Sequence, residues 1–232
     1  MTDIQLGKII QGDCLEILPS IPDKSFDYTF TSPPYNRLKN DKYELFDDKN
    51  KNYFDFLQKT VSQCLRISKN YVFFNIMPNY DNRHDVYRLI GDFSDVIQQI
   101  IVWEKLNPQP AQLCSVTNAY EFFLVLGDKP IKSKFPNVRN HVKSNVNSAF
   151  NPKTHHAVMN RDIADWVFDC FIPDGSTILD PFMGYGTTGV IAEEHNCKWM
   201  GIEVIPAYIK GATERIETAR NCKNLKFAFF QD

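Results

Sequence analysis

The sequence predicts an α/β fold with a doubly wound, mostly parallel sheet of seven strands, one of them antiparallel. Three observations support this fold class. Short runs rich in β-branched and aromatic residues alternate with segments whose apolar residues recur at helical spacing. The 232 residues, 43% hydrophobic and 23% charged, suffice to bury one sizeable core. Prolines and glycines stand where predicted strands end, at the edge where such sheets bind ligands.

Seven apolar runs are short enough to be strands, and two segments have a helical apolar face. The predicted strands are Lys8–Gln11, Phe26–Thr31, Tyr71–Ile76, Val96–Trp103, Glu121–Leu126, Ser176–Leu179 and Lys198–Ile202. The predicted helical faces contain Phe54, Leu57, Val61 and Leu65 in the first helix, and Ile163, Trp166, Val167 and Cys170 in the second. No helical pattern separates the fourth strand from the fifth, so we expect this pair to be antiparallel.

Composition limits the class of protein. No linker divides the chain, so we expect one catalytic domain over residues 1–232. A formal net charge of -2 and a pI of about 6.2 argue against a surface built throughout to bind polyanions, which restricts any nucleic-acid site to a local patch. The six cysteines lie far apart and no secretory leader is visible, so we expect reduced thiols and a cytoplasmic protein. No apolar stretch approaches the roughly 20 residues of a membrane helix.

Two stretches are expected to be loop insertions. Residues 37–52 are dense in lysine, asparagine and aspartate, and residues 127–153 combine proline, asparagine and serine with little periodicity. No acidic residue stands between Asp128 and Asp162, although this segment contains several lysines and arginines. A local excess of positive charge is what phosphate contacts require, whereas an ordinary solvated loop is the alternative.

The stretch STILDPFMGYGTTGVIAEEHNCKWMGIEV, residues 176–204, predicts a strand, a glycine loop, a helix and a second strand that ends near Glu203. Gly184 and Gly186 let the backbone turn sharply and let a ligand approach without a Cβ in the way, and the helix start offers free N–H groups. Glu203 stands where a carboxylate can accept hydrogen bonds from two ribose hydroxyls. The pattern predicts a nucleoside-containing cofactor. NAD stays open, because Gly189 completes a G-x-G-x-x-G pattern.

The stretch TFTSPPYNRL, residues 29–38, places Pro33 and Pro34 directly after a predicted buried strand. Prolines have a fixed φ and no N–H donor, so such a turn is rigid and its carbonyls are free to face a ligand. A plain proline turn that ends a strand is the alternative interpretation. The glycine stretch is needed to favour a functional site.

Taken together, Ser32-Pro33-Pro34-Tyr35 and the later Asp180-Pro181-Phe182-x-Gly184-x-Gly186-Thr187 resemble motifs of one family. The chain is similar to the S-adenosylmethionine-dependent DNA amino-methyltransferases of the permuted β class, in which the catalytic motif precedes the cofactor motif. The resemblance covers nearly the whole chain and implies a sheet of the class I methyltransferase type. It implies S-adenosylmethionine as cofactor, bound by Asp13, Asp180, Pro181, Phe182, Gly184, Gly186, Thr187, Glu203 and His156.

The same resemblance assigns roles to the proline corner. The Pro33 carbonyl and the Ser32 side chain would accept the N–H bonds of an exocyclic amine, which localises its lone pair and aims it at the sulfonium methyl group. Tyr35 would stack on a base flipped out of the duplex, since the amine is unreachable inside the stack. The implied catalytic residues are Ser32, Pro33, Pro34 and Tyr35.

The resemblance implies double-stranded DNA as substrate and leaves the target base open. Family members with serine at the position of Ser32 usually methylate N4 of cytosine, which we favour, and those with aspartate usually methylate N6 of adenine. Asn36 resembles many adenine-modifying members, so N6 of adenine stays the alternative. Less favoured are an RNA or protein amide methyltransferase, an inactive subunit that binds cofactor and DNA, and a dehydrogenase.

The expected DNA contacts come from the two loop insertions. The first could also close over the flipped base. No separate target-recognition domain is visible, so a homodimer or a cognate restriction or modification partner is possible. No metal is expected, because the adjacent His155 and His156 point in different directions without ligand partners at suitable spacing. The predicted nucleic-acid contacts are Asn36, Arg37, Lys132, Lys134, Arg139 and Lys143.

Overall fold

The structure is a computed structural model that describes residues 4–36, 50–108, 110, 116–146 and 158–229, with side chains described up to residue 223. Its elements alternate along the chain as the sequence predicts. In order they are β1 (Lys8–Gln11), α1 (Cys14–Ile17), η1 (Leu18–Ser20), β2 (Phe26–Thr31), α2 (Tyr53–Ile67), β3 (Ser68–Ile76), α3 (Arg83–Asp92), β4 (Ile97–Lys105), β5 (Tyr120–Leu126), β6 (His141–Ser144), α4 (Arg161–Phe171), β7 (Thr177–Asp180), α5 (Thr187–Glu194), β8 (Lys198–Glu203) and α6 (Pro206–Phe229).

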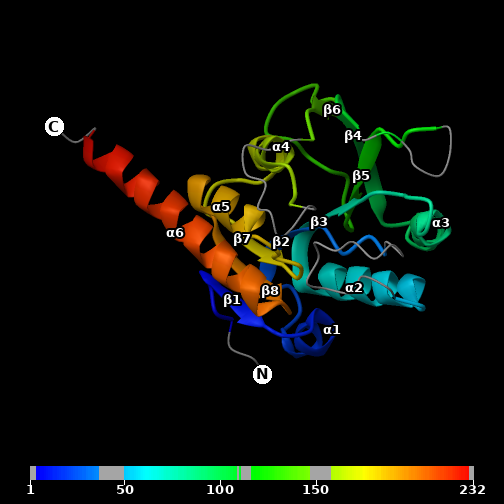
Figure 1. Cartoon of the computed structure of the whole chain (residues 1–232), viewed down its shortest axis with the longest axis horizontal. Coiled ribbons are helices and arrows are strands. Elements are labelled where there is room, and N and C mark those ends of the chain that lie inside the picture. The colour runs from blue at the N-terminus through cyan, green and yellow to red at the C-terminus, as the bar shows by residue number, and fades with distance from the viewer. Residues whose placement is uncertain (1–3, 37–49, 109, 111–115, 147–157, 230–232) are drawn as a thin grey trace.

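The strands form one sheet in the order β1-β8-β7-β2-β3-β5-β4-β6. β5 is antiparallel to both β3 and β4, and the other pairings are parallel, which confirms a mostly parallel sheet with one antiparallel strand. Figure 1 shows α4, α5 and α6 on one side of the sheet and α1 and α2 on the other. In Figure 1, α6 extends away from the sheet toward the carboxyl terminus.

The predicted number of strands is wrong, because the sheet has eight. The additional strand, β6, lies inside the segment 127–153 that the sequence indicated as a loop. It is only four residues long and has one neighbour, pairing in parallel with residues 102–105 of β4. A strand this short at the sheet edge buries one side chain, Ser144, and therefore has no apolar alternation to detect.

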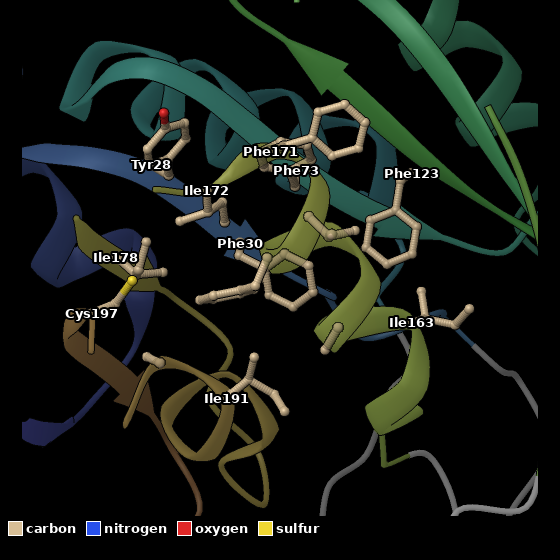
Figure 2. Packing of buried hydrophobic residues seen from close by; sticks show 14 of the residues in the cluster. Tyr28, Phe30, Phe73, Phe123, Ile163, Phe171, Ile172, Ile178, Ile191 and Cys197 are labelled. Carbon is tan, nitrogen blue, oxygen red and sulfur yellow. The ribbon is translucent and has the colours of Figure 1, made fainter. Parts of the chain in front are cut away.

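The core is layered on the two faces of the sheet. On one face, side chains of β2, β3 and β5 meet those of α4 and α5 (Figure 2). There Phe30 stacks on Phe123 with ring centroids 5.7 Å apart and meets the edge of Phe168 at 5.4 Å. On the other face, α2 and α3 cover β3 and β5. These aromatic contacts fix α4 over the sheet.

Both predicted helical faces are confirmed. Leu57 and Val61 of α2 are fully buried, and Val167 of α4 is fully buried as well. Asn160 caps α4, since its Oδ1 accepts a hydrogen bond from the Asp162 N–H at 2.7 Å. The cap fixes where α4 begins, next to the carboxyl edge of the sheet.

The carboxyl edge, at which the parallel strands end, receives both sequence motifs. β2 and β7 are adjacent and parallel, with Thr29 beside Leu179. The serine–proline corner follows β2 directly, and Asp180 is the last residue of β7. Both motifs therefore lie at the carboxyl ends of neighbouring parallel strands, the edge at which the sequence predicts a ligand site.

Three further findings concern the described part of the chain. No helix there has the length and apolar content that crossing a membrane would need. The cysteines at 14, 64, 170, 197 and 222 are free thiols. Within the same ranges, no group of three or more histidine, cysteine, aspartate or glutamate side chains could hold a metal ion.

Candidate active site

A buried hydrogen bond joins the two motifs. The Thr31 hydroxyl, at the end of β2, donates to Asp180 Oδ1 at 2.6 Å. Asp180 also accepts from the Phe182 N–H at 3.0 Å and from the Thr188 hydroxyl at 2.5 Å. Burial raises the pKa of Asp180 to about 6. Because its oxygens accept protein donors, Asp180 positions the glycine loop; its contact with the cofactor stays a prediction.

Glu203 holds the glycine loop from the neighbouring strand. Its Oε2 accepts the Gly184 N–H at 2.8 Å, and its Oε1 accepts the Ile205 N–H at 2.9 Å. Gly184 has φ +50° and Gly186 has φ +77°, in the left-handed region that glycine adopts readily. Burial raises the pKa of Glu203. The Glu203 carboxylate is thus fixed beside the turn at Gly184 and Gly186, where no Cβ stands between the backbone and a ligand.

The end of β1 brings Asp13 to the same place. The Gly12 N–H donates to the Glu203 carbonyl at 3.0 Å, which ties the two strand ends together. Asp13 then caps α1, accepting the Leu15 N–H at 2.8 Å, and its side chain stays exposed. Asp13 and Glu203 are therefore two carboxylates next to adjacent strand ends.

The third glycine of the G-x-G-x-x-G pattern serves helix packing. A Cβ on Gly189 would lie 2.4 Å from Ile216 Cδ1 of α6. A Cβ on Gly186 would lie 2.9 Å from Ala212 Cβ. Close approach of α5 to α6 accounts for Gly189, so the pattern gives no separate support for a dinucleotide.

The remaining predicted cofactor residues surround this loop, with one exception. Pro181 is buried. Phe182 is half-buried with its ring centroid 5.6 Å from that of Phe56. Thr187 is buried in the first turn of α5 and donates to the Met159 carbonyl at 3.4 Å. His156 lies outside the described residues.

At the proline corner, the carbonyls of Pro33 and Pro34 differ in their hydrogen bonds. The Tyr53 hydroxyl of α2 donates to the Pro34 carbonyl at 2.6 Å. Among the described residues no donor reaches the carbonyl of Pro33, and Pro33 itself is buried. The corner is therefore held by one carbonyl while the other stays available to a ligand.

Behind the corner lies a polar cluster that joins three strand ends. Ser32 Oγ is 3.0 Å from the Tyr35 hydroxyl and 3.2 Å from Asn75 Oδ1. The Tyr35 hydroxyl is in turn 2.8 Å from Asn75 Oδ1 and 2.8 Å from Glu121 Oε2. Asn75 is the penultimate residue of β3 and Glu121 the second of β5, so the antiparallel pairing of these strands brings both to the carboxyl edge. The sequence analysis missed both; the available indication was a polar residue at the end of an otherwise apolar run.

The cluster includes a buried ion pair. Lys105 Nζ is 2.7 Å from Glu121 Oε1, and the two side chains are 10% and 8% exposed. Burial of the Tyr35 hydroxyl, together with the nearby Glu121 charge, raises the pKa of Tyr35 well above its usual value. Tyr35 therefore stays protonated and donates.

Tyr35 is fixed at both ends, since its backbone carbonyl accepts from the side-chain amides of Asn79 at 2.9 Å and Asn82 at 2.8 Å. Stacking of its ring on a base stays a prediction. Asn36 is buried with φ +50°, and its Oδ1 accepts the Asn50 N–H at 2.8 Å. This bond joins the two ends of the segment 37–49. Contact of Asn36 with DNA stays a prediction, and Arg37 lies outside the described residues.

The structure does not bring Lys132 and Lys134 to the catalytic corner. Lys134 donates its N–H to the Cys170 carbonyl at 2.6 Å and its Nζ to the Ile172 carbonyl at 3.0 Å. Those carbonyls lie at the carboxyl end of α4, at the sheet edge opposite the proline corner. Lys132 is exposed at this same amino edge. β5 runs antiparallel to β3, so the segment that follows it starts at the amino edge. Contact of Lys132 and Lys134 with DNA stays a prediction.

Arg139 and Lys143 lie closer to the carboxyl edge. Lys143 is on β6, exposed, and pairs with Glu104 at 3.0 Å. Arg139 is exposed just before β6. Since β6 runs parallel to β4, it leads toward the same edge as the corner. Their contact with DNA stays a prediction.

Comparison with known families defines the class of protein that this site belongs to. Residues 26–214 match the family model of N6/N4 methyltransferases described as DNA methylase. The chain belongs to this N6/N4 DNA methylase family. Membership confirms the enzyme class and the methyl donor, S-adenosylmethionine, that the sequence predicts for it.

Two curated relatives are similar over most of this chain. Type II methyltransferase M.HinfI of Haemophilus influenzae is 25% identical over 249 residues, covering 91% of this chain and 68% of that protein. Type II methyltransferase M.BamHI of Bacillus amyloliquefaciens is 27% identical over 235 residues, covering 86% of this chain and 55% of that protein. The chain is thus similar to little more than half of the second relative's length.

Solved structures share the fold. The PvuII DNA methyltransferase (cytosine-N4-specific) has a TM-score of 0.72 at 19% identity, covering 94% of this chain and 95% of that one. The M1.HpyAVI–SAM complex has a TM-score of 0.66 at 19% identity, covering 90% and 98%. Together with the family match, these likenesses confirm a methyltransferase-type α/β fold.

Proposed function

We propose that this chain transfers a methyl group from S-adenosylmethionine to the exocyclic amine of a base flipped from double-stranded DNA, with N4 of cytosine as the favoured target. The observation that carries the proposal is the buried Thr31–Asp180 hydrogen bond, because it joins the serine–proline corner to the glycine loop at one sheet edge. A nucleophile and a methyl donor held at two such neighbouring corners can be oriented for transfer.

The cofactor side of the site fits a nucleoside. Gly184 places no Cβ at the loop, and Glu203 and the exposed Asp13 offer carboxylate oxygens beside it. Glu203 would accept from the ribose hydroxyls, and the first turn of α5 would face the polar end of the ligand. When bound, S-adenosylmethionine supplies an electrophilic methyl group. The protein supplies the position of that group relative to Ser32.

The acceptor side needs hydrogen-bond acceptors instead of a strong base. An amine on an aromatic ring is a weak nucleophile because its lone pair is delocalised. The Pro33 carbonyl and the Ser32 hydroxyl oxygen would accept its two N–H bonds and localise that lone pair. Pro34 keeps the corner rigid, since its carbonyl is already bound by Tyr53. A ring stacked on Tyr35 would then face the methyl donor.

The choice of base rests on Ser32. A neutral hydroxyl at this position favours N4 of cytosine over N6 of adenine in the family pattern. The residue that resembles adenine-modifying members, Asn36, has its side-chain oxygen engaged by the Asn50 N–H. It therefore gives adenine no independent support. N6 of adenine is the second candidate, and RNA or protein amides are less favoured.

The direct test is identification of the product. Duplex DNA is incubated with the protein and methyl-labelled S-adenosylmethionine, digested to nucleosides and analysed by mass spectrometry. We expect labelled N4-methylcytidine, and none with Ser32→Ala. Labelled N6-methyladenine alone would overturn the choice of base. Absence of any labelled nucleoside, from protein that binds the cofactor, would overturn the enzymatic proposal in favour of an inactive subunit.

The wider setting is proposed on the same basis. The chain acts as one catalytic domain in the cytoplasm on double-stranded DNA. The DNA would lie along the carboxyl edge of the sheet, because the corner and the glycine loop are both there. A second copy or a cognate restriction or modification partner would supply further sequence selectivity.

A further inference from the structure

Five side chains behind the proline corner form a continuous hydrogen-bonded set, here called the corner cluster. It runs from Ser32 at the open side, through Tyr35 and Asn75, to the Glu121–Lys105 ion pair inside. The distances along it are between 2.7 and 3.2 Å. Ser32 and the Tyr35 ring have roles in the proposed chemistry so far, and the other three side chains have none.

The number of donor protons in the corner cluster shows what its inner end, the Glu121–Lys105 ion pair, does. Asn75 Nδ2 donates to the Phe122 carbonyl at 3.2 Å, so its Oδ1 faces the cluster and can only accept. An ionised Glu121 can also only accept. Two hydroxyl protons, on Ser32 and Tyr35, therefore serve two acceptors, Asn75 Oδ1 and Glu121 Oε2. If Tyr35 donates to Glu121, the Ser32 proton is free to go to Asn75, and the Ser32 lone pairs face outward.

We propose that Glu121, paired with Lys105, is a positioning residue that accepts the hydrogen bond of the Tyr35 hydroxyl and thereby leaves the Ser32 oxygen free to accept from the target amine. The inference rests on the proposed function and assigns that site an inner group that never touches substrate. A hydrogen bond to a charged acceptor is stronger than one to a neutral acceptor, so the Tyr35 proton prefers Glu121 to Asn75.

Lys105 makes the proposal sharply testable. In Glu121→Gln, the amide oxygen would face Lys105 Nζ and the NH₂ group would face Tyr35, because an ammonium group cannot accept. The Tyr35 oxygen would then accept a hydrogen bond from residue 121, and the Tyr35 hydroxyl would donate its own hydrogen bond to Asn75 or Ser32. Either arrangement competes with the Ser32 proton or occupies a Ser32 lone pair.

The test measures kcat and KM for methyl transfer to duplex DNA, with cofactor affinity by calorimetry. Glu121→Gln should lower kcat by about ten- to a hundredfold, the range for a lost charge-assisted hydrogen bond, and leave S-adenosylmethionine affinity unchanged. Lys105→Met combined with Glu121→Gln should recover part of the loss, because the amide is then free to turn its oxygen to Tyr35. This double variant also removes both buried charges, so it stays testable if the single variant does not fold.

Coupling through one hydroxyl gives a second readout. Tyr35→Phe removes the hydroxyl that donates to Glu121. The double variant Tyr35→Phe, Glu121→Gln should therefore have a kcat no lower than that of the slower single variant. The matched control is Glu193→Gln, a carboxylate bound to Arg220 at the far end of α5, away from the corner, which should leave kcat unchanged.

The outcomes separate this inference from the proposed function. A folded Glu121→Gln variant with wild-type kcat would overturn the inference, as would equal loss in the Lys105→Met, Glu121→Gln double variant. Strictly additive losses with Tyr35→Phe would do the same. If the wild-type protein methylates no DNA, the proposed function itself fails and the inference falls with it.

Discussion

At the scale of single residues, the carboxyl edge gathers polar side chains whose partners come from neighbouring strands. Thr31 bonds to Asp180, and Gly184 bonds to Glu203 across another strand pair. Each bond is buried or half-buried, where a missing partner costs more than at the surface. The geometry of the site is therefore set by contacts between strands that are distant in sequence.

Asp180 predicts a dependence of stability on pH. Its pKa in the folded protein, about 6, lies above the ordinary 3.8, so the folded state favours the protonated acid. The stability that this group contributes is fully present below pH 3.8 and is lost as the pH rises through 6. Asp180→Asn can keep the same partners, since its amide can donate to Thr188 and its oxygen can accept from Thr31 and Phe182.

Urea denaturation of both proteins between pH 4 and pH 7.5 measures this effect. Relative to Asp180→Asn, the wild type should lose up to about 3 kcal/mol of unfolding free energy over that range. Two profiles that run parallel across the range would show that Asp180 is not the titrating group.

Glu203 predicts a loss of cofactor binding with little loss of fold. Glu203→Gln keeps one acceptor for a backbone N–H and removes the charge that would face the ribose. We expect S-adenosylmethionine affinity to fall by about ten- to a hundredfold, the range for hydrogen bonds to a charged group. Calorimetric titration measures the affinity, and thermal melting serves as the control for the fold. Unchanged affinity would remove Glu203 from the cofactor site.

The residues of the two motifs could be predicted from the sequence, whereas the residues that hold the motifs in place could not. The serine–proline corner and Glu203 stand out because proline, glycine and a strand-end acid have local backbone or chemical meaning. Asn75 and Glu121 do not, because each is one polar residue beside an apolar run. Their role depends on the antiparallel pairing of β3 with β5, which brings the end of one strand beside the start of the other.

At the scale of elements, the packing of α5 on α6 depends on glycine. Gly189 has no room for a Cβ, which would lie 2.4 Å from Ile216 Cδ1 and 3.0 Å from its Cγ1. Since α5 follows the glycine loop directly, a shift of this helix would displace the loop. The third glycine of the motif thus acts on the site through helix contact.

Gly189→Ala should destabilise the protein by about 1–3 kcal/mol, as overpacking does. Adding Ile216→Val removes the Cδ1 atom and should restore part of that loss. The control is Gly91→Ala in α3, where a Cβ meets nothing within 4 Å; it should be neutral or stabilising by about 0.5–1 kcal/mol. Guanidinium denaturation measures all three. A Gly189→Ala protein as stable as wild type would contradict the close packing.

Most elements could be predicted because their apolar residues repeat over several turns or pleats. α2 and α4 have wide buried faces, and seven strands have mainly apolar sequences. β6 escaped prediction because it is short, polar and at the edge. The edge to which the lysines after β5 belong could not be read from the sequence either, since strand direction is a property of the whole sheet.

At the scale of the whole molecule, the charge is distributed unevenly between the two sheet edges. The basic residues after β5 divide into an amino-edge group and a group near β6. β6 lies four strands from β2, which leads into the corner, about 19 Å at ordinary strand spacing. A duplex that lies along the carboxyl edge would pass over β6 but would not reach the opposite edge.

Arg139→Ala and Lys132→Ala form a matched pair that tests this placement, since both side chains are exposed in the same acid-free segment. Arg139→Ala should weaken DNA binding several-fold and reduce the salt dependence by about one phosphate contact. Lys132→Ala should change neither. Fluorescence anisotropy at two salt concentrations measures both quantities. Equal losses for both variants would contradict binding along the carboxyl edge.

The central claim is that the serine–proline corner and the glycine loop hold one amine and one methyl donor together. The most direct test is a crystal structure of the protein with a duplex and S-adenosylhomocysteine. We predict ribose hydroxyls on Glu203, an extrahelical base at Ser32 and Pro33, and room for one methyl group between sulfur and amine, a near-attack separation of about 3–3.5 Å from carbon to nitrogen. A cofactor bound away from Gly184, or a base that stays stacked in the duplex, would contradict the account.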